Sequence, residues 1–214
     1  MISEPAPSPA REGSGRRQAS VRAGASGDEP QLVAMLARAY RDDPLYRWCY
    51  PEDSLRLEQL EQVFGLFGNQ IFGYDETYTT DGILGAALWI PPDKWRMCAV
   101  TKAGVIHGLT TKIGTRHVAR ALRTLYLMQS RHPPEPSHYH LPFIGVEPEE
   151  QRKGLGTALL QPMLERCDRE GLPAYLEATT PGNIAFFERN GFEIRQRIAL
   201  RDGPPLWPMW RDPR

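Results

Sequence analysis

The chain has 214 residues, enough to bury one substantial core, and its 26 Lys and Arg residues balance 26 Asp and Glu residues. The resulting pI near 7.0 excludes a global field that would attract nucleic acid or an anionic membrane, so any phosphate recognition must be local. The longest uncharged apolar stretch, Gly82 to Pro92, is far shorter than the ~20 residues that cross a bilayer. We therefore expect a soluble protein with neither a nucleic-acid nor a membrane partner, whose oligomeric state the sequence leaves open.

The N-terminal segment, residues 1–27, is rich in Pro, Ser, Gly, Ala and Arg and has almost no large apolar side chains. Such a composition does not offset the entropy lost on ordering, so we predict a disordered tail. The folded domain is expected over residues 28–214. It begins with a helix that Asp28 caps and that runs to about Tyr40, before Asp43-Pro44 breaks it.

A second helix is predicted from Ser54 to about residue 71, because its apolar residues recur on one side. A hairpin follows, with a strand at 77–80, a turn at Asp81-Gly82 and a strand at 83–90. Residues 95–130 suggest two helical pieces. A proline-rich linker then occupies residues 131–136.

The remainder alternates between strands and helices. In chain order we expect a strand at 139–146, a glycine-rich loop, a helix to residue 170, a strand at 174–179, a helix at 183–190, and strands at 192–200 and 206–211. A strand–helix–strand unit joins parallel strands by a right-handed crossover, while hairpins add antiparallel strands. The order of elements therefore predicts a mixed α/β sheet.

The glycine-rich loop has the features of a phosphate-binding turn. It reads Gln151, Arg152, Lys153, Gly154, Leu155, Gly156, Thr157 and stands between a strand and a helix. Its glycines let the backbone approach an anion, and the helix N-terminus adds a positive dipole. Neither the Walker A pattern nor the dinucleotide Gly-x-Gly-x-x-Gly fingerprint is present. An ordinary strand-to-helix turn is the alternative.

A second block strengthens the interpretation. Residues 172–192 contain Pro-Ala-Tyr-Leu-Glu, then Asn-x-x-x-Phe-Glu-Arg and Gly-Phe. With the Gln/Arg-x-x-Gly-x-Gly loop, this block resembles the GNAT family of N-acetyltransferases, and within it most closely the puromycin N-acetyltransferase-like members. The resemblance covers roughly residues 138–194. It implies a single GNAT-like α/β domain with a mixed, mostly antiparallel central sheet, a splayed parallel strand pair, and helices on both faces.

The same resemblance implies acetyl-CoA as the acetyl donor and assigns residues to it. The loop would bind the pyrophosphate through backbone amides, with Arg152 and Lys153 as further phosphate contacts. The strand before the loop would lend backbone groups to the pantetheine and thioester, at Phe143, Ile144, Gly145 and Val146. Asn183 matches the family's asparagine, and it either caps the last helix or hydrogen-bonds the cofactor.

Position 187 departs from the family pattern. Many members carry a tyrosine there, assigned as the acid that protonates the leaving thiolate, and Phe187 has no proton to give. A thiol with a pKa near ~8.5 is a tolerable leaving group, so this departure does not exclude transfer. Phe187 is still expected beside the cofactor. Tyr175 is a possible substitute acid, with core packing as its alternative role.

Glu177 is the candidate catalytic residue. The strand alternates Ala174, Leu176 and Ala178 with more polar residues, which places Glu177 on the face opposite the aliphatic one. An alkylamine with a pKa near ~10.4 is mostly charged at neutral pH, so a carboxylate is needed to help remove its proton. The alternative is a solvated carboxylate with no catalytic role.

Two further groups invite a functional interpretation. His138 and His140 share a strand face, but the sequence shows no third ligand at a suitable spacing, so no metal site is predicted. The aromatic residues Tyr46, Trp48, Tyr50 and Trp89 are candidates for binding the acceptor, with core packing as the alternative.

These patterns together favour an acetyl-CoA-dependent N-acetyltransferase acting on a primary amine of a small molecule, such as an aminonucleoside or antibiotic-like compound. A protein or peptide acetyltransferase is the alternative enzyme. A CoA-binding module without turnover is the alternative outside enzymes. The scattered cysteines suit a reducing cytoplasm.

Overall fold

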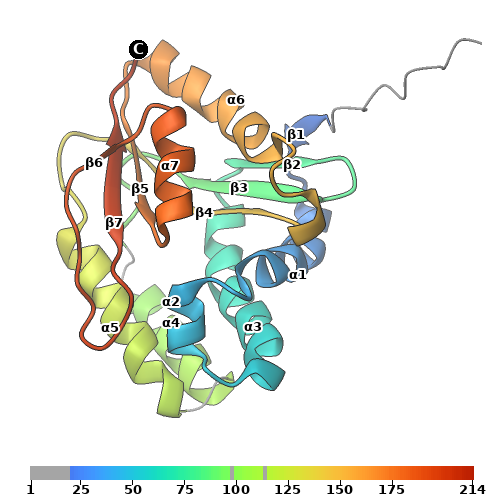
Figure 1. Ribbon diagram of the computed structural model, residues 1–214, viewed down its shortest axis with the longest axis vertical. Helices are drawn as coiled ribbons and strands as arrows, with labels where there is room; N and C mark the ends of the chain where they lie inside the picture. The colour runs from blue at the N-terminus through green and yellow to red at the C-terminus, as the bar shows by residue number, and fades with distance from the viewer. Residues whose placement is uncertain (1–19, 97–98, 113–114) are drawn as a thin grey trace, which may run out of the picture.

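The computed structural model describes residues 20–96, 99–112 and 115–214. One sheet runs through the molecule, with helices packed on both of its faces (Figure 1). The helices are α1 (Glu29–Tyr40), α2 (Pro44–Cys49), α3 (Asp53–Phe72), α4 (Ala99–Lys112), α5 (Thr115–Arg131), α6 (Leu155–Glu170) and α7 (Pro181–Arg189). The strands are β1 (Val21–Ala23), β2 (Thr77–Thr80), β3 (Gly85–Ile90), β4 (Tyr139–Val146), β5 (Ala174–Ala178), β6 (Glu193–Ile194) and β7 (Trp207–Arg211).

The strand order is β1-β2-β3-β4-β5-β7-β6 in a 7-stranded sheet. Among the strands that the structure describes, β4 and β5 form the one parallel pair, and α6 makes the crossover between them; the other pairs are antiparallel. The predicted fold class, a mixed and mostly antiparallel sheet with one parallel pair and helices on both faces, is confirmed.

Strand β4 loses its partner part-way along its length. Its first residues, 139–141, pair with 174–176 of β5, and the two strands then continue without further pairing in the described ladder. Pro142 follows the last pair and has no N–H to extend the ladder. A bulge lies at the same place, because Leu88 of β3 faces Phe143 whereas Ile90 faces His140. Proline and bulge together account for the splay of β4 from β5.

The two faces of the sheet have separate cores. Helices α1 to α5 cover one face, where Leu36, Phe64 and Leu88 are buried. Helix α6 covers the other face, where Leu159, Met163 and many β5 side chains are buried. The splay of β4 and β5 therefore opens between two packed layers.

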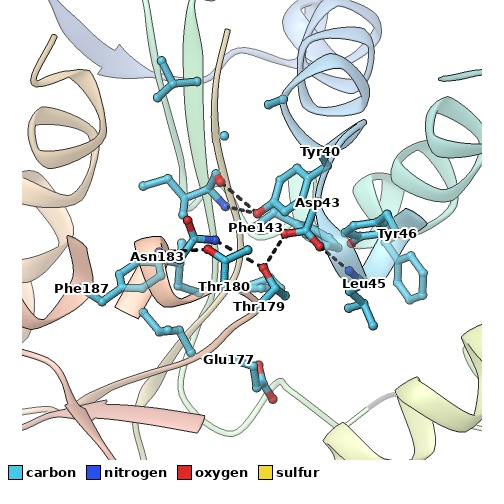
Figure 2. A pocket seen from close by; sticks show the side chains of 18 of the residues that line it. Tyr40, Asp43, Leu45, Tyr46, Phe143, Glu177, Thr179, Thr180, Asn183 and Phe187 are labelled. Atoms are coloured by element: carbon cyan, nitrogen blue, oxygen red, sulfur yellow. Dashed lines mark hydrogen bonds between the residues drawn. The ribbon is translucent and has the colours of Figure 1, made fainter. Parts of the chain in front are cut away.

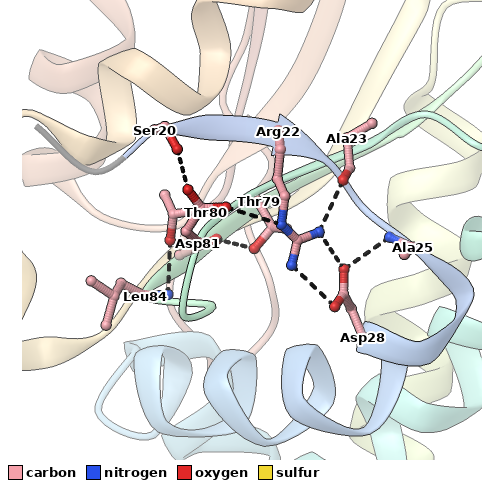
Figure 3. Close-up of polar contacts among 10 residues, drawn as sticks. Ser20, Arg22, Ala23, Ala25, Asp28, Thr79, Thr80, Asp81 and Leu84 are labelled. Carbon is pink, nitrogen blue, oxygen red and sulfur yellow. Dashed lines mark hydrogen bonds and ion pairs between the residues drawn. The ribbon is translucent and has the colours of Figure 1, made fainter.

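The predicted boundary of the disordered tail is wrong at its C-terminal end. Residues 21–23 form β1, paired with β2 from Val21↔Thr80 to Ala23↔Tyr78. Figure 3 shows how the segment is held: Arg22 Nη1 lies 2.6 Å from a carboxylate oxygen of Asp28, and Ser20 donates to Asp81. A short edge strand can be held by a few backbone hydrogen bonds. The amino-acid composition of residues 21–23 therefore does little to indicate a strand. Residues 1–19 lie outside the described part of the chain.

Other differences concern short elements. Helix α1 ends at Tyr40, as predicted, but the sequence does not predict the short helix α2 that follows. Asp43 is its N-cap, with a side chain that accepts from Leu45 N, and proline suits the first helical position. Of the strand predicted at 192–200, only β6 and an isolated bridge between Ile198 and Leu206 are present. In the part of the chain that the structure describes, no helix combines the length and apolar character needed to span a bilayer.

Candidate active site

A pocket of about 970 Å³ lies where β4 and β5 diverge. On one side it is lined by β4, the glycine-rich loop and α7, and on the other by α2, α3, α4 and α5. The predicted site residues that line it are Phe143, Ile144, Gly145, Val146, Gln151, Arg152, Gly154, Gly156, Thr157, Glu177, Asn183, Phe187, Tyr46 and Tyr50. The tertiary structure thus brings the predicted cofactor, catalytic and acceptor residues to one cavity.

Glu177 directly follows Leu176, the last β5 residue that pairs with β4, and lies on the pocket face of β5 (Figure 2). Its side chain is only 2% exposed, and each carboxylate oxygen has a partner. Tyr175 OH donates to Oε1 at 3.1 Å, and His140 Nε2 lies 3.1 Å from Oε2. Burial raises the pKa of the Tyr175 phenol, so this group remains a donor. The alternation that predicted the orientation of Glu177 is confirmed, since Leu176 and Ala178 pack beneath α6.

The glycine-rich loop leads directly into α6. Gly154 is the N-cap residue, with φ +92°, and within the described structure no side chain caps the helix. The first-turn N–H groups of α6 are therefore available to an external acceptor, as at an anion site. Gln151 Nε2 donates to Val146 O at 3.1 Å, which ties the loop to β4.

Some predicted loop contacts have other surroundings. Lys153 lies outside the pocket lining, and its Nζ is 3.0 Å from Glu150 Oε1. Leu155 is buried in the first turn of α6 and also lies outside the lining. Arg152 does line the pocket, together with Arg189 of α7. Arginines from two elements therefore contribute positive charge to the pocket lining.

The Gly154 position provides a direct test of the loop. Replacing Gly154 with valine is expected to weaken CoA binding at least tenfold, because a β-branched residue is strained at φ +92° and its side chain would stand before the helix N-terminus. Calorimetric titration of CoA measures this. Gly171→Val is the matched control, since Gly171 also has a left-handed φ of +67° but ends α6 far along the helix. Unchanged CoA affinity in a folded Gly154 variant would contradict the assignment.

Tyr40 of α1 reaches into the splay. Its hydroxyl donates to Ile144 O at 2.9 Å and accepts from Ile144 N at 3.2 Å (Figure 2). Burial raises the pKa of Tyr40, which keeps the hydroxyl protonated. The Ile144 peptide, left without a strand partner on this side, is thereby satisfied. Sequence reasoning missed this contact, because the hydroxyl and its partner are far apart in the chain.

A polar chain crosses the mouth of the splay (Figure 2). Asn183 Nδ2 donates to Thr179 Oγ1 at 3.3 Å, and Thr179 in turn donates to the Asp43 carboxylate. Burial raises the pKa of Asp43, and the hydrogen bonds from Thr179 and Leu45 N oppose that shift. Asn183 is not the helix cap: its N–H donates to Oγ1 of Thr180, which is the N-cap of α7.

The aromatic candidates separate into two groups. Tyr46 and Tyr50 lie one helical turn apart in and after α2 and line the pocket. Trp48 points elsewhere, with Arg120 Cζ 5.1 Å from its ring centroid, and lies outside the lining. Trp89 is fully buried beneath α6. The acceptor-binding prediction is therefore wrong for Trp48 and Trp89, because each faces away from the cavity.

Phe187 is 5% exposed, packs against Phe186 and Phe192, and lines the pocket.

The described cysteines, Cys49 and Cys167, are free and buried. Burial raises the pKa of each thiol to about 12, so both are protonated. Each packs as a small apolar residue in one of the two cores.

The model of the acetyltransferase (GNAT) family matches residues 34–192, most of the described chain. The chain belongs to the GNAT family. The predicted enzyme class is confirmed at the level of this family.

Individual relatives agree with this membership. An uncharacterized N-acetyltransferase, C550.08, from Schizosaccharomyces pombe is 41% identical over 78 residues, and this match spans only 32% of its length. A structure described as histone acetyltransferase HPA2 and related acetyltransferase, from Corynebacterium glutamicum, has a TM-score of 0.69 at 23% identity, covering 92% of this chain and 97% of that one. Arylalkylamine N-acetyltransferase 2 from Aedes aegypti has a TM-score of 0.60 at 12% identity, covering 91% and 99%. At these identities the solved structures show the fold alone.

Proposed function

We propose that this GNAT protein transfers the acetyl group of acetyl-CoA to a primary amine of a small molecule. The observation that carries the proposal is the buried Glu177 carboxylate, which lies at the opening of the β4–β5 splay in the same pocket as the glycine-rich loop. A CoA-binding module without turnover has no need of a buried, doubly hydrogen-bonded carboxylate at this point.

The residues of the pocket fit acetyl-CoA, which supplies the acetyl group as a thioester when bound. The uncapped N-terminus of α6 suits the pyrophosphate, and Arg152 and Arg189 suit further phosphate charge. Residues 143–146 of β4 pair with β3 but have no strand partner on the β5 side, where Tyr40 OH holds the backbone N–H and C=O of Ile144. This open side of the strand suits the pantetheine arm. Asn183 and Phe187 line the adjacent wall.

Glu177 is assigned to take the proton of the acceptor amine, directly or through water. Tyr175 and His140 hold its carboxylate in one orientation, so the base is positioned before the acceptor arrives. No proton donor is available at Phe187. The protein therefore relies on the low pKa of the leaving thiol, ~8.5, rather than on an acid at that position.

The other half of the pocket indicates a compact acceptor with an apolar or aromatic body. Tyr46, Phe67 and Phe143 line this half of the pocket, and α4 and α5 add Leu109, Leu125 and Met128. Phe64 is buried behind them, in a tilted contact with Tyr46 and an edge-to-face contact with Phe143. An aminonucleoside or similar antibiotic-like amine, as for the puromycin-type members, matches such a wall. The neighbour from Aedes aegypti is named for arylalkylamines, although its likeness shows the fold alone.

The test is acetyl-CoA-dependent thiol release across a panel of acceptors. The panel contains an aminonucleoside, arylalkylamines, aliphatic polyamines, and peptides with free N-termini or lysines. Turnover with the aromatic amines at a kcat/KM at least tenfold above that for peptides is the expected result. Preference for peptides would assign a protein or peptide acetyltransferase, and CoA binding without turnover on any acceptor would assign a binding module.

A further inference from the structure

Three potential metal ligands meet at the base of the splay. One ring nitrogen from His132, one from His140 and a carboxylate oxygen of Glu177 all lie within 4.8 Å of one another. His132 directly follows α5, whereas the other residues come from β4 and β5. The sequence predicts no metal because it shows no third ligand near His138 and His140. The fold instead brings His132 and Glu177 to His140 from distant positions, and His138 is not a member of this set.

A chain of hydrogen bonds fixes the tautomer of His132. His138 Nδ1 lies 2.7 Å from Pro136 O, a pure acceptor, so Nδ1 carries the proton and His138 Nε2 is left as an acceptor. His132 Nε2 lies 2.9 Å from that nitrogen and must therefore donate to it. The remaining nitrogen, His132 Nδ1, then has a free lone pair. A ligating histidine held through its second nitrogen is the usual arrangement at metal sites.

The cluster is also largely shielded from solvent. His132 is 6% exposed as a whole residue, and the side chain of Glu177 is 2% exposed. The buried Nδ1 of His140 has no hydrogen-bond partner among the described residues. In the metal-free protein His140 Nε2 donates to Glu177 Oε2, so when Nε2 binds a metal the ring proton moves to Nδ1.

We propose that His132, His140 and Glu177 form a binding site for a zinc ion. Two imidazoles and one carboxylate are zinc ligands, and water completes the tetrahedron. With metal–ligand bonds of about 2.0–2.1 Å, tetrahedral ligand atoms lie about 3.4 Å apart. His140 Nε2 and Glu177 Oε2 are already 3.1 Å apart, so His132 is the residue that must move inward to close the site.

Zinc bound to this cluster would occupy the carboxylate that we assign as the base. The zinc-bound protein is therefore expected to be inactive in acetyl transfer, a consequence that rests on the proposed function. The binding site itself does not rest on it, because the site is defined by its ligands. Zinc would act as a reversible inhibitor that competes with the acceptor amine for Glu177.

The experiment titrates zinc alone into the full chain, freed of metal by a chelator, in competition with a chromophoric chelator. One zinc ion per chain is expected. The affinity should fall at least tenfold in His132→Gln and in the nearly isosteric Glu177→Gln. His107→Gln is the control, because His107 is an exposed histidine of α4 outside the cluster, and its affinity should equal that of the original chain.

Each outcome bears on the proposal. Zinc binding that is absent from the original chain, or that is equal in all folded variants, would overturn it. Thermal unfolding and CoA binding establish that each variant is folded. Because zinc binding is measured without substrates and turnover without zinc, failure of the metal site leaves the proposed acetyl transfer untouched. Conversely, a chain without turnover can still bind zinc.

Discussion

Replacing Glu177 with glutamine is expected to lower kcat by roughly 10²–10⁴-fold while leaving the affinity for acetyl-CoA little changed, because a general base contributes on that scale. Glutamine keeps the shape of the side chain and an oxygen that accepts from Tyr175 OH. The loss should shrink as pH rises toward ~10.4, where free amine becomes abundant without a base. Steady-state kinetics across pH, with CoA affinity from calorimetry, measure both effects.

A matched variant separates the carboxylate's role from a change in net charge. Glu188→Gln removes the same charge from an exposed position on α7, outside the pocket lining, and is expected to keep the original rate. Folding of both variants is checked by thermal unfolding. If Glu177→Gln had the original rate at every pH, Glu177 would have no part in proton transfer.

Two truncations of the N-terminus are expected to differ in their effect on stability. A chain that begins at Ser20 should keep its stability and turnover, whereas a chain that begins at Asp28 should lose on the order of 2–4 kcal/mol of unfolding free energy. The difference is β1, whose backbone hydrogen bonds to β2 include Gly24 N to Thr77 O at 2.7 Å, each worth about 0.5–1.5 kcal/mol net. Thermal and urea unfolding of both chains measure this loss.

A point variant provides the control for this comparison. Arg22→Ala keeps the backbone of β1 but removes the contacts from Arg22 to Asp28, so it should cost much less than loss of the strand. Equal stability of the chains beginning at Ser20 and Asp28 would show that β1 does not contribute. A large loss in the Ser20 chain would show that residues 1–19 are needed for stability, contrary to their composition.

The sequence predicts best where a short segment determines its own geometry. Gly154 and Gly156 between a strand and a helix predict an open helix N-terminus, and the structure has Gly154 in the left-handed region at that position. Alternation along β5 predicts that Glu177 faces away from Leu176, as observed. Both predictions succeed because backbone conformation and side-chain direction follow from neighbouring residues.

Prediction from the sequence fails where neighbouring residues do not indicate which side of the sheet a side chain faces. Every side chain in the predicted strand 83–90 is apolar or absent, so no alternation indicates that Trp89 faces α6 rather than the pocket. No pattern predicts the short helix α2, so the sequence does not indicate that Tyr46 and Tyr50 lie one helical turn apart and line the pocket while Trp48 lies outside it. The strand β1 was missed because its composition resembles that of the preceding tail.

What the sequence by itself determined is thus the GNAT family, the α/β class, the glycine-rich loop and the orientation of Glu177, all set by local pattern. The tertiary structure alone decided which groups meet. The bulge and Pro142 in β4 open the splay, Tyr40 satisfies the Ile144 peptide, and His132 and His140 come to Glu177. These contacts depend on packing between residues that are far apart in the chain, and no local periodicity in the sequence encodes them.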